Sequence, residues 1–440
     1  MDAASAFGLS LVSLPHQHQY PLLPTHGNRA SVASEIAPAI CHRIRAHKKI
    51  GDSSSPPQRR RLTCQIEETD VMSIKARTSR RQCSAQRVSV RFTAASALAV
   101  ACGLASAQSG VTLYGRVAGG IDYTNKIDTG SSQSAGRLQY GSNQWGTSMW
   151  GLRASEDLGG GLKAVMNLEN GFTSADGVAS GGLFNRYAVA GLSSSTYGTL
   201  LVGRAMGIPD SEVYTIDPMG LQFMSAATFQ GNRTWGSRTK AITYNSPVWG
   251  GWSFRAQAGL NGTAGNFNAG RQLAASIGYQ NGPLMLKGFY EDIRDSAGQF
   301  TNLYTASRLY TAGGTYQIGD AKLFGGYSQI QSSGNTIADA DNPTGATRQQ
   351  TYWIGTNYQM TPAATLVGGV YRTHRNHGGG TGTLLTLGVN YALSKRTLLY
   401  GTVGTVLNGK QSTFSVEANG GKPAAGASQQ GVYTGIVHVF

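Results

Sequence analysis

From residue 110 to the end of the chain, apolar and polar residues alternate with a period of two. Near the start of this region, Val111, Leu113 and Val117 share one parity, and Tyr114 and Arg116 share the other. The same pattern recurs around residues 152, 166, 254 and 389. Such alternation indicates β-strands with one apolar and one polar face. Residues 108–440 are therefore predicted to be all-β.

The connections between these predicted strands alternate between short turns and longer polar loops. Seven short turns include those at 157–161 and 281–283. The eight loops lie at about 125–135, 172–183, 207–237, 262–270, 295–303, 332–346, 375–382 and 408–428. Seven turns and eight loops make fifteen connections and hence sixteen strands. This alternation of short and long links is typical of transmembrane β-barrels with periplasmic turns and extracellular loops.

A sheet that spans a bilayer must close on itself, because lipid offers its backbone groups no hydrogen-bond partners. We therefore expect a closed, sixteen-stranded antiparallel transmembrane β-barrel. Its interior is too wide for side chains to fill, so the polar strand faces line an aqueous channel. No apolar run reaches the ~18 residues of a spanning helix, which excludes a helical membrane protein.

The first 107 residues differ in composition from the rest of the chain. They hold all four cysteines and a net charge of +8 (14 basic minus 6 acidic residues). Residues 72–107 run from a basic stretch through an apolar segment to Ala-Ser-Ala, the order of a secretory signal peptide, and we predict cleavage after Ala107. A lipidated Cys102 is the alternative. We interpret residues 1–71 as a leader that is unstructured or not native to the working protein.

Residues 108–440 contain no sequence motif for catalysis or cofactor binding. They lack cysteine, a glycine-rich phosphate loop and a G-x-S-x-G elbow. His374 and His377 have too few potential ligands nearby to form a metal site. The net charge of +15 would suit a nucleic-acid binder, but more than half of it lies in the first 107 residues. We expect no enzyme, no cofactor, no metal and no nucleic-acid partner.

Several segments have the motifs of a known family. The stretch WGLRASEDLGGGLKA at residues 150–164, with LENGF at 168–172, is similar to the second hairpin of the β-proteobacterial trimeric porins, a type of Gram-negative general porin. QSGVTLYG at 108–115 resembles their first strand, and the terminal Phe440 resembles the aromatic residue that the barrel-assembly machinery reads. The resemblance implies a homotrimer in the outer membrane, in contact with lipid and lipopolysaccharide. It also implies that the third loop, 207–237, folds inward and narrows each barrel.

The resemblance further implies a constriction in which basic wall residues face carboxylates on the third loop. The matching wall positions are Arg116, Arg153 and Arg186, with Lys163 and Arg255 as weaker candidates of the same parity. The charged residues of the third loop and its return are Asp210, Glu212, Asp217, Arg233 and Arg238. The alternative is that each arginine is an ordinary solvated wall residue, and that Asp210 and Glu212 only cap the loop.

Two departures from the family pattern concern the same wall. Met149 stands where such porins commonly carry an arginine, and Val437 and Val439 replace polar or basic residues of the last strand. The basic wall is therefore expected to be one charge short.

The expected function is passive diffusion of ions and small hydrophilic solutes through a water-filled outer-membrane channel. Residues 108–440 hold 23 basic and 16 acidic residues, which predicts a mild preference for anions. Two alternatives are a substrate-selective channel and a barrel that acts through its loops as an adhesin or receptor.

Overall fold

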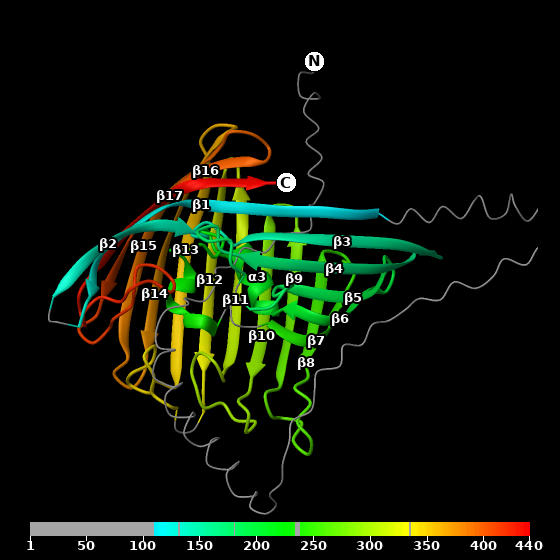
Figure 1. Ribbon diagram of the computed structural model, residues 1–440, viewed down its shortest axis with the longest axis horizontal. Helices are drawn as coiled ribbons and strands as arrows, with labels where there is room; N and C mark the ends of the chain where they lie inside the picture. The colour runs from blue at the N-terminus through cyan, green and yellow to red at the C-terminus, as the bar shows by residue number, and fades with distance from the viewer. Residues whose placement is uncertain (1–109, 131–132, 180, 234–237, 334–335) are drawn as a thin grey trace, which may run out of the picture. The chain divides into compact units, whose positions relative to one another are not determined.

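A computed structural model describes residues 110–130, 133–179, 181–233, 238–333 and 336–440. The expected leader and signal peptide, including Ala107, lie outside these residues. The described residues form one antiparallel sheet, in which most strands pair with their neighbours along the chain (Figure 1).

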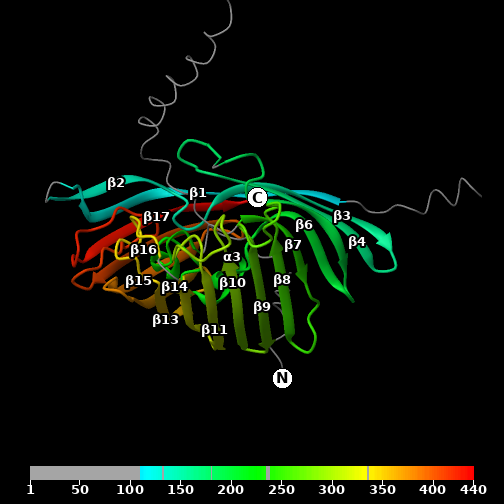
Figure 2. The ribbon, with the colours of Figure 1, turned by 90° about the horizontal axis from the view of Figure 1, so that it is seen from below.

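The sheet contains seventeen strand segments. They are β1 (Gly110–Asp128), β2 (Ser134–Ser142), β3 (Ser148–Gly159), β4 (Leu162–Phe172), β5 (Tyr187–Ser194), β6 (Gly198–Met206), β7 (Arg238–Asn245), β8 (Trp252–Gly259), β9 (Gln272–Asn281), β10 (Leu284–Ile293), β11 (Arg308–Ile318), β12 (Ala321–Gln331), β13 (Arg348–Gln359), β14 (Ala364–Arg375), β15 (Gly380–Ala392), β16 (Thr397–Asn408) and β17 (Gln429–Val439). The last strand lies beside the first, with Val439 opposite Arg116, and this pairing closes the sheet (Figure 2).

The segments β2 and β3 share one position around the barrel. Both pair with β1: Gly119 is opposite Ser142 of β2, and Arg116 is opposite Met149 of β3. The two segments therefore follow one another along β1, interrupted at residues 143–147. Seventeen segments occupy sixteen positions, which confirms the predicted sixteen-stranded closed barrel.

Two connections are shorter than the sequence predicts. The loop expected at 125–135 is reduced to 129–133, because β1 continues past an irregularity where Lys126 has a φ of 49°. The loop expected at 375–382 is reduced to 376–379, because Gly378 and Gly380 adopt positive φ angles that allow a tight hairpin. His374 lies in β14.

The two faces of the sheet differ as the alternation predicts. On β15, Leu385 and Leu387 are exposed, whereas Leu384 and Thr386 are buried. Exposed aromatic residues mark the turn ends of many strands, as in the aromatic girdle of a membrane barrel: Trp252, Tyr316, Tyr358 and Tyr391. We call this exposed face the outer face and the opposite one the polar face. Among the described residues, no helix is long and apolar enough to cross a membrane.

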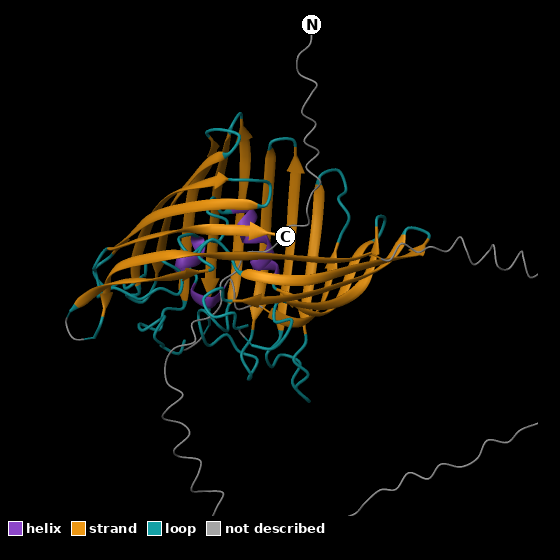
Figure 3. Ribbon diagram, turned by 45° about the horizontal axis from the view of Figure 1, so that its top comes forward, coloured by secondary structure: helices purple, strands orange, loops and turns teal. Residues whose placement is uncertain are grey.

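The loop after β6 contains the helical segments α3 (Ile208–Ile216), η1 (Ala226–Phe229) and η2 (Gly231–Arg233). A proline near the start of α3 suits a first turn, where the missing N–H has no helical acceptor. The helix lies beside β8 to β12. The helical segments are drawn in purple among the orange strands in Figure 3. Apolar side chains of this loop, including Ile208, Val213, Ile216 and Phe229, are fully buried and form much of the hydrophobic core.

Candidate functional site

Charged side chains on the polar face gather in two clusters near the loop after β6. The β4 cluster consists of Arg116, Arg153, Glu169 and Arg186 from the first four barrel positions. The α3 cluster consists of Glu212 on α3 with Arg255 on β8 and Lys287 on β10. The two clusters contain five cations and two carboxylates.

The β4 cluster is organised around Glu169. This carboxylate accepts hydrogen bonds from the Arg186 guanidinium at 2.6 Å and from the Tyr114 hydroxyl at 2.8 Å. Arg116 donates to the backbone oxygen of Thr147 at 2.8 Å. Arg116, Glu169 and Arg186 are each at most 2% exposed, so this part of the wall is rigid and holds more positive than negative charge.

Arg153 is the member of the β4 cluster that faces open space. Its guanidinium lies 4.0 Å from the centre of the Tyr114 ring, a favourable cation–π distance. The side chain lines a cavity of about 500 Å³ together with Glu169 and with Arg255 of the other cluster. An ion in this cavity is therefore close to charges from both clusters.

In the α3 cluster, the loop contributes the carboxylate. Glu212 forms ion pairs with Arg255, at 2.8 Å, and with Lys287. Burial favours the neutral acid, but these two cations outweigh that effect and hold the pKa of Glu212 below its ordinary value. Glu212 is therefore ionised at neutral pH, and the ion pairs tie α3 to the polar face of β8 and β10.

Asp217 anchors the loop without facing the basic wall. It accepts hydrogen bonds from the Tyr371 hydroxyl at 2.6 Å and from the backbone N–H groups of Met219 and Ala226 at 2.9 and 3.1 Å. Complete burial raises its pKa to about 6, although these hydrogen bonds oppose the rise. Beside it, the Trp353 indole donates to the backbone oxygen of Ile216 at 2.8 Å.

The remaining predicted residues of the loop are assigned to neither cluster or have no described side chain. Arg233 is 1% exposed, pairs with Glu291 on β10 and donates to the Ser307 hydroxyl at 3.0 Å. Asp210 is fully buried in the first turn of α3. Arg238 begins β7, and its side chain lies outside the described part of the structure.

Lys163 is not brought into either cluster. It is exposed near the turn end of β4, six residues along the strand from Glu169. A rise of about 3.3 Å per residue places it roughly 20 Å from that carboxylate.

The departures from the family pattern surround Arg116. Met149 is completely buried directly opposite Arg116, and Val439 lies opposite on the other neighbouring strand. The terminal Phe440 pairs through its backbone N–H and C=O with Gly115, at 3.0 Å in both directions. A Cβ atom on Gly115 would collide with the Phe440 ring, so glycine is needed there.

Two residues of the clusters, Glu169 and Lys287, were not among the predicted ones, and neither was Glu291, the partner of Arg233. Glu169 lies within the LENGF motif, and Lys287 has the opposite parity to the exposed Leu286. Parity could therefore have identified Lys287 as a wall residue. The pairing of Lys287 and Glu291 with the third loop depends on how that loop is folded, which parity does not describe.

Comparison with known proteins gives consistent matches over the barrel. Residues 94–411 match the sequence profile of the Gram-negative porin family. Outer membrane porin protein 32 of Delftia acidovorans is 32% identical over 367 residues, which cover 78% of this chain and 98% of that protein. An outer membrane porin of Bordetella pertussis is 30% identical, covering 70% of this chain and 91% of its own length.

A solved structure extends these matches to the fold. The anion-selective porin from Comamonas acidovorans superposes with a TM-score of 0.65 at 27% identity, covering 76% of this chain and all of that one. The family profile covers more than half of the chain, and the closed barrel agrees with it. The chain therefore belongs to the Gram-negative porin family and is a channel-forming, multi-pass β-barrel protein of the outer membrane.

Proposed function

We propose that this porin is a passive channel for ions and small hydrophilic solutes with a mild preference for anions. The observation that carries the proposal is the charge imbalance of the two clusters, where five cations face two carboxylates. A water-filled passage lined in this way attracts anions and repels cations. The structural relative from Comamonas acidovorans, which is described as anion-selective, supports the same assignment.

We further propose that residues 207–237 form the constriction of the channel. The support is that α3 lies against β8 to β12 and that Glu212 pairs with cations on the polar face of two of these strands. The β4 cluster then provides the opposing basic wall. The β4 cluster holds three cations and one carboxylate, whereas the Glu212 carboxylate of the loop offsets one of the two cations beside it, and this unequal charge creates a transverse field that favours dipolar solutes over apolar ones.

Several further assignments complete the proposal. Residues 72–107 serve as the export signal, and the family match begins within their apolar run, at residue 94. Residues 1–71, which precede that match, are not part of the channel. Phe440 serves as the assembly signal for the barrel-assembly machinery. The barrel forms a homotrimer and performs no catalysis, so its partners are the membrane lipids and the solutes that pass through it.

The channel is tested by inserting refolded protein of residues 108–440 into planar bilayers and recording current in KCl. Discrete, ohmic conductance steps are expected. The absence of steps would contradict the channel assignment, and loop-dependent binding without conductance would favour a receptor. Flux into liposomes that rises linearly with solute concentration supports passive diffusion, whereas saturation would indicate a substrate-selective channel.

A further inference from the structure

The polar face of β1 and the segments that cover it contain four buried oxygen atoms that form no hydrogen bond with any described residue. They are Oδ1 of Asp122, Oγ1 of Thr124, Oε1 of Gln144 and Oε1 of Glu417, and each of these residues is at most 2% exposed. We call these four residues the oxygen cluster. Buried polar atoms in proteins are almost always hydrogen-bonded, so unsatisfied oxygens that lie together require an explanation.

The strand register and the loops bring the oxygen cluster together. Asp122 and Thr124 occupy successive polar-face positions of β1, about 7 Å apart along the strand. Gln144 lies in the interruption between β2 and β3, and its Nε2 donates to Oδ2 of Asp122 at 3.3 Å, so its unsatisfied Oε1 is close to that carboxylate. The carboxyl group of Glu417 lies against that of Asp122.

Glu417 is held beside β1 by the packing of the last loop, residues 409–428. Val416 and Ala418, its two neighbours in sequence, are both buried. The backbone N–H of Ala418 donates to the backbone oxygen of Phe223 in the third loop at 2.8 Å. The backbone on both sides of Glu417 is therefore fixed, and its carboxyl group remains close to that of Asp122.

The two carboxylates of the oxygen cluster have no adequate countercharge. Neither forms an ion pair with a residue that the structure describes. Arg137, which lies opposite Thr124 on β2, favours the ionised form of Glu417, but burial and the neighbouring Asp122 outweigh it and raise the pKa of Glu417 well above its ordinary value. Two buried carboxylates in contact need either a shared proton or a bound cation.

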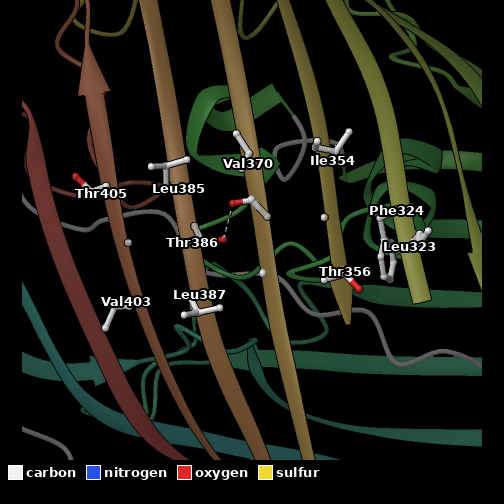
Figure 4. A pocket seen from close by; sticks show the side chains of 14 residues that line it. Leu323, Phe324, Ile354, Thr356, Val370, Leu385, Thr386, Leu387, Val403 and Thr405 are labelled. Carbon is white, nitrogen blue, oxygen red and sulfur yellow. Dashed lines mark hydrogen bonds between the residues drawn. The ribbon is translucent and has the colours of Figure 1, made fainter. Parts of the chain in front are cut away.

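A hollow on the outer face has the opposite composition. This hollow of about 810 Å³ over β12 to β16 is lined by side chains such as Val370, Leu385 and Leu387, and no charged residue lines it (Figure 4). The hydroxyl of Thr386 in its wall is satisfied, because it donates to the backbone oxygen of Gly369 at 3.4 Å. A charged ligand is therefore expected at the oxygen cluster and not in this hollow.

We propose that the oxygen cluster binds a divalent cation, Ca²⁺, which joins the last loop to β1. Ca²⁺ prefers carboxylate, amide and other oxygen ligands in an irregular arrangement, whereas Mg²⁺ requires a near-ideal octahedron. Among the described residues, no group of three or more His, Cys, Asp or Glu side chains could hold a metal ion, so this site combines two carboxylates with the neutral oxygens of Thr124 and Gln144. The inference goes beyond the proposed channel function and does not depend on its ion preference.

The test measures Ca²⁺ binding by equilibrium dialysis of the porin refolded into detergent without lipid, so that lipid phosphates contribute no cation sites. The wild type should bind about one Ca²⁺ per chain more than D122N/E417Q, with a Kd of about 10⁻⁴ to 10⁻³ M, as in extracellular calcium sites. The matched control E156Q/D157N removes two exposed carboxylates near the turn end of β3 and should bind Ca²⁺ like the wild type.

Two further measurements keep the test independent of the folding of one variant. Thr124→Val keeps the shape of the side chain but removes one oxygen ligand, and it should weaken Ca²⁺ binding about tenfold. In the wild type, Ca²⁺ should slow the exchange of backbone hydrogens at residues 415–419, and in D122N/E417Q it should not.

Equal Ca²⁺ binding by the wild type and D122N/E417Q would overturn the proposal and would assign the contact of the two carboxyl groups to a shared proton. Equal slowing of exchange in both proteins would also overturn it. Single-channel conductance steps should remain in D122N/E417Q, so the failure of this inference is distinguishable from the failure of the channel assignment.

Discussion

The β4 cluster and the α3 cluster use the same kinds of side chain but differ in the origin of their carboxylate. In the β4 cluster, Glu169 belongs to the wall itself and pairs with the buried Arg186. In the α3 cluster, Glu212 comes from the loop and pairs with Arg255 and Lys287, which remain 25% and 21% exposed. The first arrangement builds a rigid basic wall, and the second fixes the loop to the opposite strands.

The largest effect is expected from Glu169→Gln in the β4 cluster. This change removes the carboxylate that is ion-paired with the buried Arg186, and removing one partner of a buried pair costs about 3–5 kcal/mol. The free energy of unfolding, measured with urea in detergent micelles, should fall by that amount. Glu156→Gln, an exposed carboxylate near the turn end of β3, is the control. A loss in Glu169→Gln no larger than in the control would contradict the structural role given to this cluster.

The second prediction concerns the pH dependence of the loop anchor Asp217. Its folded pKa of about 6 is above the ordinary value of 3.8, so the neutral acid is favoured in the folded protein. The stabilisation is complete below pH 3.8 and is lost as the pH rises through 6, a change of about 3 kcal/mol. When the unfolding free energies are measured from pH 4 to pH 7, that of the wild type should fall by about this amount relative to that of Asp217→Asn, which has no carboxyl group to titrate. Parallel profiles would show that the carboxyl does not titrate in this range.

The fold was predictable from the sequence to a greater extent than the site. Period-two alternation and the spacing of turns define strands and their faces locally, so sixteen positions could be counted without knowing any contact. The interruption between β2 and β3 was not predicted, because the alternation on both sides of residues 143–147 has the same appearance as that of one strand. Parity alone was nevertheless enough to assign Arg116, Arg153 and Arg255 to the polar face.

The partners of these residues could not be predicted in the same way. Asp210, Glu212 and Asp217 are close in sequence, yet Glu212 is ion-paired with two cations of the wall, whereas Asp217 is hydrogen-bonded to a tyrosine of β14. Their roles depend on the path of an irregular loop over several strands. Such a path is set by long-range packing of residues such as Ile216 and Phe229, and no local pattern encodes it.

The third prediction separates the two clusters by their effect on permeation. A unit charge about 7 Å from an ion in water changes its energy by about 0.6 kcal/mol, or roughly threefold in occupancy. Glu212→Gln removes a negative charge and should raise the anion-to-cation permeability ratio by about the square of this factor, roughly sevenfold, because anion occupancy rises while cation occupancy falls. The more mobile loop should also exchange backbone hydrogens faster at residues 208–216. An unchanged ratio would place Glu212 outside the permeation path.

The fourth prediction is the counterpart on the basic wall. Arg153→Gln removes the cation that faces the 500 Å³ cavity and should lower the anion-to-cation ratio by a similar factor, with little effect on stability because the side chain is only half-buried. Lys163→Gln, an exposed cation on the next strand, should change the ratio much less. Equal effects of the two variants would mean that selectivity follows net charge and not the position of Arg153.

The most direct test of an anion-preferring passive channel is the zero-current potential of the wild-type porin in a planar bilayer that separates two KCl concentrations. The surplus of cations in the two clusters predicts a potential with the sign set by chloride, with a magnitude that decreases as total salt increases, because ions screen the wall charges. A potential with the sign set by potassium would contradict the account.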